Sequence, residues 1–195
     1  MAYQDDIKKA AALLLPWNKL SGCNILVTGA TGLIGGCLVD VLMAHKGRNY
    51  NVYASGRNEE RAGRRFLKYA DDNSFHFVKY DVAHPLEYDV NFQYIIHAAS
   101  GAYPEEFIKH PVEVIKGNIN GVDNLMGYGI QHGIKRLLYI SSGEVYGEGD
   151  GRVFTENYSG YVDCTSLRSC YPSSKRAAET CLLYTSDAAD DKARV

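Results

Sequence analysis

The stretch NILVTGATGLIG, residues 24–35, decides the fold of this 195-residue chain. Its first four residues form an apolar run typical of a buried parallel strand, and apolar residues then recur at helical spacing as far as His45. Strand, glycine-rich turn and helix in this order are the context that a dinucleotide-binding motif requires. Gly29 permits the tight turn, Gly32 lets the backbone approach a pyrophosphate, and Gly35 lets the helix pack closely on the strand. We therefore expect the N–H groups at the helix start to bind a dinucleotide.

A second motif, YPSSK (171–175), lies far downstream, and Ser141 and Ser142 precede it at the end of another apolar strand. Tyr171 and Lys175 are four residues apart, so they share one face of a helix. An ammonium group beside a phenol lowers the pKa of the tyrosine from its ordinary value of about 10. This spacing alone is common on solvated helix faces. Together with the glycine turn and the strand-end serine, it predicts a catalytic site.

In this combination the chain resembles the extended short-chain dehydrogenase/reductases, and within them the NAD-dependent nucleotide-sugar epimerases, dehydratases and decarboxylases. The resemblance covers residues from about 24 to 181 and rests on motifs that occur in the family's order. They are TGATGLIG (28–35), Asp81-Val82, HAAS (97–100), Asn118 within GNINGVDNL, SSGEVYG (141–147) and YPSSK (171–175). The family implies an enzyme that uses bound NAD or NADP for transient oxidation at C4 of a nucleotide-sugar.

The resemblance also implies roles for four catalytic residues. Tyr171 is the acid/base, and Lys175 lowers its pKa and contacts the nicotinamide ribose. Ser142 orients the sugar hydroxyl, with capping of the strand end as the alternative. Glu144 is an extra carboxylate beside the serine, which simple carbonyl reductases do not need.

The implied cofactor site combines the glycine turn with the ends of later strands. Asp81 meets the adenine by its carboxylate and Val82 by a backbone group, unless Asp81 only caps a helix. Asn118 holds a water or backbone link near Lys175, or marks a helix kink. The full set is Gly29, Thr31, Gly32, Leu33, Ile34, Gly35, Arg57, Asp81, Val82, Ala98, Ala99, Asn118, Tyr171 and Lys175.

The end of the second strand departs from the NAD pattern. An NAD enzyme usually carries an acid there to bind the ribose 2′-hydroxyl, but no acid occurs before Glu59. Ser55 and Arg57 can instead receive the 2′-phosphate of NADP. The family favours NAD and the local residues favour NADP, so both stay open.

The segment around Gly143 bears on the reaction. In the 4,6-dehydratases the matching triplet is Thr-Asp-Glu, and its Asp protonates the departing hydroxyl, whereas Gly143 has no proton to give. The UDP-glucuronate decarboxylases carry Thr-Ser-Glu, and their segment before the tyrosine resembles LRSCY (167–171). We therefore favour decarboxylation of UDP-glucuronate, with 4-epimerisation or 4,6-dehydration as alternatives. Further alternatives are an NAD(P)H-dependent carbonyl reductase and a non-catalytic NAD(P)-sensing protein, although the latter need not retain all the catalytic residues.

Composition narrows the class of protein. The chain is 46% hydrophobic, which is enough for one well-buried domain, and its net charge of -2 does not favour nucleic acid as a partner. No apolar run approaches the roughly 18 residues that a membrane span needs. Five cysteines without Cys-x-x-Cys spacing predict free thiols and a cytoplasmic protein. No metal site is expected from the scattered histidines.

The alternation of strands and helices predicts an α/β fold of the Rossmann type, a doubly wound parallel sheet in three layers with strand order 3-2-1-4-5. We expect an N-terminal helical extension over 1–22, in which Ile7, Ala11, Leu14 and Leu15 pack on the domain. We expect an incomplete NAD(P)-binding domain over 23–184 and, over 185–195, a tail foreign to the family in place of the C-terminal substrate domain. Family members often dimerise through the helices expected at 111–131 and 172–183. Expected strands lie at 24–28, 51–55, 75–79, 94–98 and 136–141, and further helices at 33–45 and 59–70.

Overall fold

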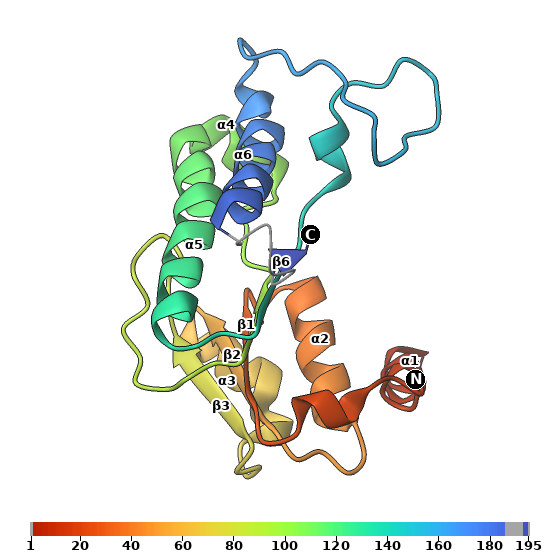
Figure 1. Ribbon diagram of the computed structural model, residues 1–195, viewed down its shortest axis with the longest axis vertical. Helices are drawn as coiled ribbons and strands as arrows, with labels where there is room; N and C mark the ends of the chain where they lie inside the picture. The colour runs from red at the N-terminus through yellow and green to blue at the C-terminus, as the bar shows by residue number, and fades with distance from the viewer. Residues whose placement is uncertain (1, 186–192, 195) are drawn as a thin grey trace.

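A computed structural model describes residues 2–185 and 193–194 (Figure 1). Its centre is a parallel sheet with the strand order β3-β2-β1-β4-β5-β6, which confirms the predicted order 3-2-1-4-5. The strands are β1 (Asn24–Thr28), β2 (Asn51–Gly56), β3 (Phe75–Lys79), β4 (Tyr94–His97), β5 (Arg136–Tyr139) and β6 (Ala193–Arg194).

Helices cover both faces of the sheet, as a three-layer fold requires (Figure 1). The α-helices are α1 (Ala2–Ala11), α2 (Leu33–Ala44), α3 (Glu59–Phe66), α4 (Pro104–Lys109), α5 (Pro111–Gln131) and α6 (Cys170–Thr185). Short 3-10 helices are η1 (Trp17–Leu20), η2 (Leu67–Tyr69), η3 (Gly143–Tyr146) and η4 (Leu167–Ser169). Helix α4 was not expected from the sequence, because its six residues are too few to show a helical period.

Side chains of β1 alternate between the two cores, because successive residues of a strand point to opposite faces of the sheet. Ile25 and Val27 enter the core beneath α2 and α3, whereas Leu26 enters the core beneath α5 and α6. All three are at most 1% exposed. With β1 buried in this way, the glycine turn lies at the carboxyl end of the strands, where α2 begins.

The N-terminal helix α1 lies beside α2 (Figure 1). Its Ile7 and Ala11 are buried, as expected. The expectation for Leu14 and Leu15 was wrong: the helix ends at Ala11, and both leucines are exposed. Once the helical period stops, spacing no longer decides which side chains face the domain.

The predicted foreign tail, 185–195, falls largely outside the described residues, since 186–192 and 195 are not among them. Within that tail, Ala193 and Arg194 pair in parallel with Leu137 and Leu138 of β5. Two residues of the tail thus occupy the edge of the sheet next to β5.

In the part of the chain that the structure describes, no helix is long and apolar enough to cross a membrane. Nor do the described His, Cys, Asp and Glu side chains form a group of three or more that could hold a metal ion.

Candidate functional site

The glycine turn is shaped by close approaches of backbone to backbone. Gly29 has a φ of +64°, and a Cβ there would lie 2.6 Å from the carbonyl oxygen of Ala98. A Cβ on Gly35 would collide with the carbonyl group of Gly29. Both positions therefore exclude side chains for reasons internal to the fold, and Gly29 also needs the left-handed conformation that glycine tolerates.

Gly32 differs from these two glycines. Its φ of -80° and ψ of 179° are open to any residue, and a Cβ there would meet the Gly29 carbonyl oxygen at 3.2 Å, a tight but not prohibitive contact. Leu33 and Ile34, which follow it, are 88% and 53% exposed although they are large and apolar. The turn thus offers helix N–H groups, a bare glycine and two uncovered apolar side chains, which suit the pyrophosphate and the apolar surfaces of a dinucleotide.

The exit of β4 is tied to the end of β1. The backbone N–H of Ala99 donates to Oγ1 of Thr28 at 3.3 Å, and Thr28 Oγ1 lies 2.8 Å from Nδ1 of His97. Burial, assisted by the charge of Lys175, lowers the pKa of His97 to about 3, so this histidine stays neutral. These contacts hold Ala98 and Ala99 against the glycine turn.

At the ends of β2 and β3, Arg57 and Asp81 come together. Nη1 of Arg57 lies 4.0 Å from a carboxylate oxygen of Asp81, and both side chains are largely exposed. Asp81 also accepts from the N–H of Ala83 at 3.1 Å, so it caps its own turn. The carbonyl of Val82 accepts from Asn124 at 3.0 Å. The turn after β3 therefore places an acid, Asp81, near the end of β2, where the second strand itself lacks one.

Ser55 does not share this exposed position. Its side chain is 1% exposed, and its Oγ has no hydrogen-bond partner among the described residues. Of the two residues expected to receive a 2′-phosphate, only Arg57 is accessible, with its side chain 79% exposed.

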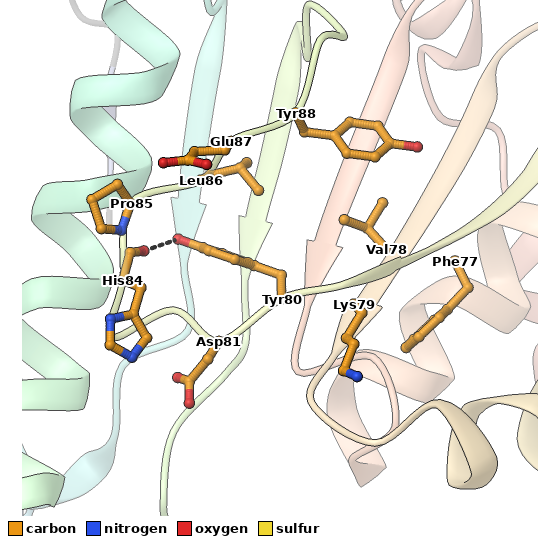
Figure 2. Close-up of a pocket in the computed structure, with 10 residues that line it drawn as sticks. All are labelled: Phe77, Val78, Lys79, Tyr80, Asp81, His84, Pro85, Leu86, Glu87 and Tyr88. Atoms are coloured by element: carbon orange, nitrogen blue, oxygen red, sulfur yellow. Dashed lines mark hydrogen bonds between the residues drawn. The ribbon is translucent and has the colours of Figure 1, made fainter.

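A cavity of about 310 Å³ lies on the edge strand β3 next to Asp81 (Figure 2). Tyr80 crosses it and donates to the carbonyl of His84 at 2.9 Å. The cavity shares only Asp81 with the candidate site residues, so it adjoins the adenine end of the proposed site and not the reaction end. Its lining residues are Phe77, Val78, Lys79, Tyr80, Asp81, His84, Pro85, Leu86, Glu87 and Tyr88.

At the reaction end, α6 carries Tyr171 and Lys175 in the interior, 7% and 2% exposed. The Lys175 ammonium donates to the carbonyl of Ile140 at 2.9 Å. It lies 4.4 Å from the centre of the Tyr139 ring and 5.7 Å from that of Tyr171. Burial lowers the pKa of Lys175 to about 8, although Glu179 opposes this shift. The ammonium group is thus held beside the phenol ring in a site with little water.

Ser142 and Glu144 belong to the turn that follows β5. Oγ of Ser142 accepts from the N–H of Glu144 at 3.2 Å, which is the capping contact considered above. The Glu144 carboxylate accepts from Arg168 at 2.7 Å. Arg168 comes from η4, immediately before the tyrosine helix, so this ion pair joins the serine turn to the start of α6.

Asn118 connects three parts of the site. It is 1% exposed, accepts from Ser100 at 2.8 Å and donates to Ser174 at 2.9 Å. Ser174 in turn donates to the carbonyl of Tyr171 at 3.0 Å. Asn118 therefore links the β4 exit to the residue before Lys175, and the helix that carries it, α5, is continuous from Pro111 to Gln131.

Three neighbours of the candidate site were not anticipated from the sequence. Phe107 of α4 stacks on Tyr171 with ring centres 4.8 Å apart, and the Arg168 guanidinium lies 5.6 Å from the Phe107 ring. Glu179 accepts from Ser141. Glu179 could have been found from the sequence, because it follows Lys175 by one turn on the same helix. Phe107 could not, because it lies on α4, which was not predicted.

The sequence of this chain is similar to those of known proteins. A family model described as "NAD dependent epimerase/dehydratase family" matches residues 25–194. UDP-glucuronic acid decarboxylase 6 of Arabidopsis thaliana is 36% identical over 163 residues, which are 82% of this chain and 45% of that protein. UDP-glucuronic acid decarboxylase 1 of Danio rerio is 34% identical over 163 residues, 82% of this chain and 37% of that protein. The chain thus spans less than half the length of these relatives.

Solved structures share the fold. The dTDP-glucose 4,6-dehydratase of Bacillus anthracis, in complex with NAD, matches with a TM-score of 0.69 at 21% identity, over 88% of this chain and 53% of that one. The UDP-Glc/GlcNAc 4-epimerase of Campylobacter jejuni matches with a TM-score of 0.69 at 21% identity, over 86% and 50% of the two chains.

Proposed function

This chain belongs to the NAD-dependent epimerase/dehydratase family, and we propose that the protein is a nucleotide-sugar enzyme that decarboxylates UDP-glucuronate with NAD or NADP bound. The observation that carries the proposal is the combination of Glu144, held by Arg168 at 2.7 Å, with a glycine at position 143. This arrangement keeps a carboxylate beside the strand-end serine but provides no acid at 143 to protonate a departing hydroxyl.

The proposed chemistry begins with the C4 hydroxyl of the sugar. The bound dinucleotide supplies an acceptor for the hydride that leaves C4. Tyr171 takes the hydroxyl proton, and the buried Lys175 ammonium beside it stabilises the phenolate. Ser142, on the turn after β5, orients the same oxygen.

Oxidation at C4 makes the uronic acid a β-keto acid. The bond from C5 to the carboxyl carbon then breaks and CO2 leaves. The electron pair of the broken bond forms the enolate of the C4 ketone. Solvent water supplies the proton that C5 of the enolate takes up, and this restores the C4 ketone. Tyr171 then returns its proton to the C4 oxygen as the hydride returns to C4 from the bound dinucleotide. None of these steps needs a protein acid at Gly143.

The direct test is to incubate the intact protein with UDP-glucuronate and to follow CO2 and UDP-pentose by mass spectrometry. We expect UDP-pentose without net accumulation of reduced cofactor. A C4 epimer, or a 4-keto-6-deoxy sugar from another nucleotide-sugar, would replace decarboxylation with one of the family's other reactions. Net consumption of reduced cofactor on a simple carbonyl substrate would instead identify a reductase.

The residues fit a dinucleotide of either kind, and the choice depends on Arg57. We propose NADP, because Arg57 is the accessible cation at the end of β2. The NAD alternative draws support from Asp81, which lies within 4.0 Å of Arg57 and can accept from a ribose hydroxyl.

Arg57→Ala is expected to weaken NADP binding by about 10- to 150-fold and to change NAD binding little. The reason is that a charge-assisted phosphate contact contributes roughly 1.5–3 kcal/mol. Calorimetric titration with both cofactors measures the effect. Lys79→Ala, which removes a neighbouring cation paired with Glu59 at 3.0 Å, is the matched control. Equal losses for both cofactors in Arg57→Ala would show that Arg57 does not contact the 2′-phosphate, and no loss for either would make Arg57 a bystander.

The proposal extends to organisation and assembly. We take 23–184 as the cofactor-binding domain, 1–22 as a helical extension, and α5 and α6 as the dimerisation surface of the intact protein. Within one chain α5 packs against α6, and in the proposed dimer two such helix pairs pack together.

A further inference from the structure

Lys175 and Glu179 hold two consecutive residues at the exit of β5. The Lys175 ammonium donates to the carbonyl oxygen of Ile140 at 2.9 Å. The Glu179 carboxylate accepts from the hydroxyl of Ser141, the next residue along the chain. Because residues four apart share a helix face, the two side chains of α6 lie side by side. They bind the two residues that directly precede Ser142.

The positive charge of Lys175 is stabilised by the Ile140 carbonyl and by the faces of two aromatic rings, and otherwise by few groups. The side chain is 2% exposed, so water contributes little. The groups that face it are the ring of Tyr139 from β5, the ring of Tyr171 from α6 and the neutral His97 from β4. Among the described residues, Glu179 is the anion that acts on Lys175.

We propose that Glu179 is a positioning residue with two roles: it tethers Ser141, and so the turn that carries Ser142, to the catalytic helix, and its charge keeps Lys175 in the ammonium form. Only the expected effect of Glu179 on turnover rests on the proposed function. The tether and the charge effect are properties of the folded chain.

The two roles can be separated because the tether depends on a hydrogen bond, whereas the effect on Lys175 depends on a charge. Glu179→Gln removes the charge but retains an oxygen that can accept from Ser141. Ser141→Ala removes the hydrogen bond but leaves the carboxylate. Burial already lowers the pKa of Lys175 to about 8, and an opposite charge nearby favours the charged form. Loss of the Glu179 charge must therefore lower that pKa further.

The experiment is an NMR titration of the Lys175 side chain in the intact protein with ¹³C-labelled lysine, the signal being assigned with Lys175→Arg. We expect a midpoint near pH 8 in the unaltered protein and a midpoint at lower pH in Glu179→Gln. Ser141→Ala and the surface control Glu60→Gln, which lies on α3 and pairs with Arg64, should not lower it. An unchanged midpoint in Glu179→Gln, or an equal shift in Ser141→Ala, would overturn the assigned charge role.

Turnover provides the second readout. In Glu179→Gln, kcat should fall more at pH 8 than at pH 6.5 because Lys175 loses its proton earlier, while KM for the sugar changes little. In Ser141→Ala, kcat should fall to a similar extent at both pH values, and an unaltered kcat would overturn the tether. If Glu179→Gln does not fold, Glu179→Ala removes the same charge and is titrated in the same way. If no nucleotide-sugar is turned over at all, the proposed function fails, and the NMR titration still decides the role of Glu179.

Discussion

Tyr171→Phe is expected to lower turnover of the nucleotide-sugar by about 100- to 10,000-fold, the range that general acid–base catalysis contributes. The change removes one hydroxyl and leaves the ring, which is 7% exposed and stacks on Phe107 with centres 4.8 Å apart. Packing should therefore persist, and the loss should appear in kcat. Steady-state kinetics at neutral pH measure it, with calorimetry to verify that cofactor binding is retained.

The matched control is Tyr161→Phe, which removes the same atom from a tyrosine that is 67% exposed in the loop before α6. It should turn over substrate at nearly the rate of the unaltered protein. Should Tyr171→Phe also do so, the phenol would not be the acid/base, and the candidate site would have to be assigned again.

The second large effect concerns stability and arises from Asp40 in α2. Its carboxylate is fully buried and accepts from Tyr3 at 2.6 Å, Arg65 at 2.5 Å, Lys68 at 2.9 Å and Tyr69 at 2.9 Å. These donors come from α1, α3 and η2, so one side chain joins three helices on this face of the sheet. Burial by itself would raise the pKa of Asp40, but the hydrogen bonds outweigh it and hold the pKa at about 2.

Asp40→Asn is expected to lower the free energy of unfolding by about 3 kcal/mol. Removing one partner of a buried ion pair costs roughly 3–5 kcal/mol, and partial exposure of Arg65 and Lys68 (29% and 39%) places this case at the low end. Urea unfolding at pH 7 measures it. The control Glu60→Gln breaks an exposed ion pair and should cost less than about 1 kcal/mol.

The same carboxylate predicts a pH dependence. The folded-state pKa of about 2 lies below the ordinary value of 3.8, so the stabilisation is complete above pH 3.8 and is lost as the pH falls towards 2. The difference corresponds to about 2 kcal/mol. Asp40→Asn should lack this part of the acid-induced loss, and an identical acid profile in both proteins would contradict the assignment.

The sequence predicted strands β1 to β5, their order and the glycine turn because each depends on short-range pattern, whereas β6 was not expected. An apolar run such as Ile25 to Val27 suffices to indicate a buried strand, and right-handed crossovers then restrict the order of the sheet. It also placed Tyr171 and Lys175 on one helix face, since four residues make about one turn. The expectation for Leu14 and Leu15 was wrong because the same periodicity cannot tell where a helix ends.

The sequence by itself therefore determined the family, the doubly wound sheet and the residue types of the candidate site. Only the tertiary structure decided which side chains meet across the chain: Ser141 with Glu179, Arg57 with Asp81, Phe107 with Tyr171, and Asp40 with its four donors. Such partners are 24 to 64 residues apart, and each pair exists only after the strands and helices that carry them have packed. Local periodicity shows the face on which a side chain lies, whereas packing alone selects the group that it meets.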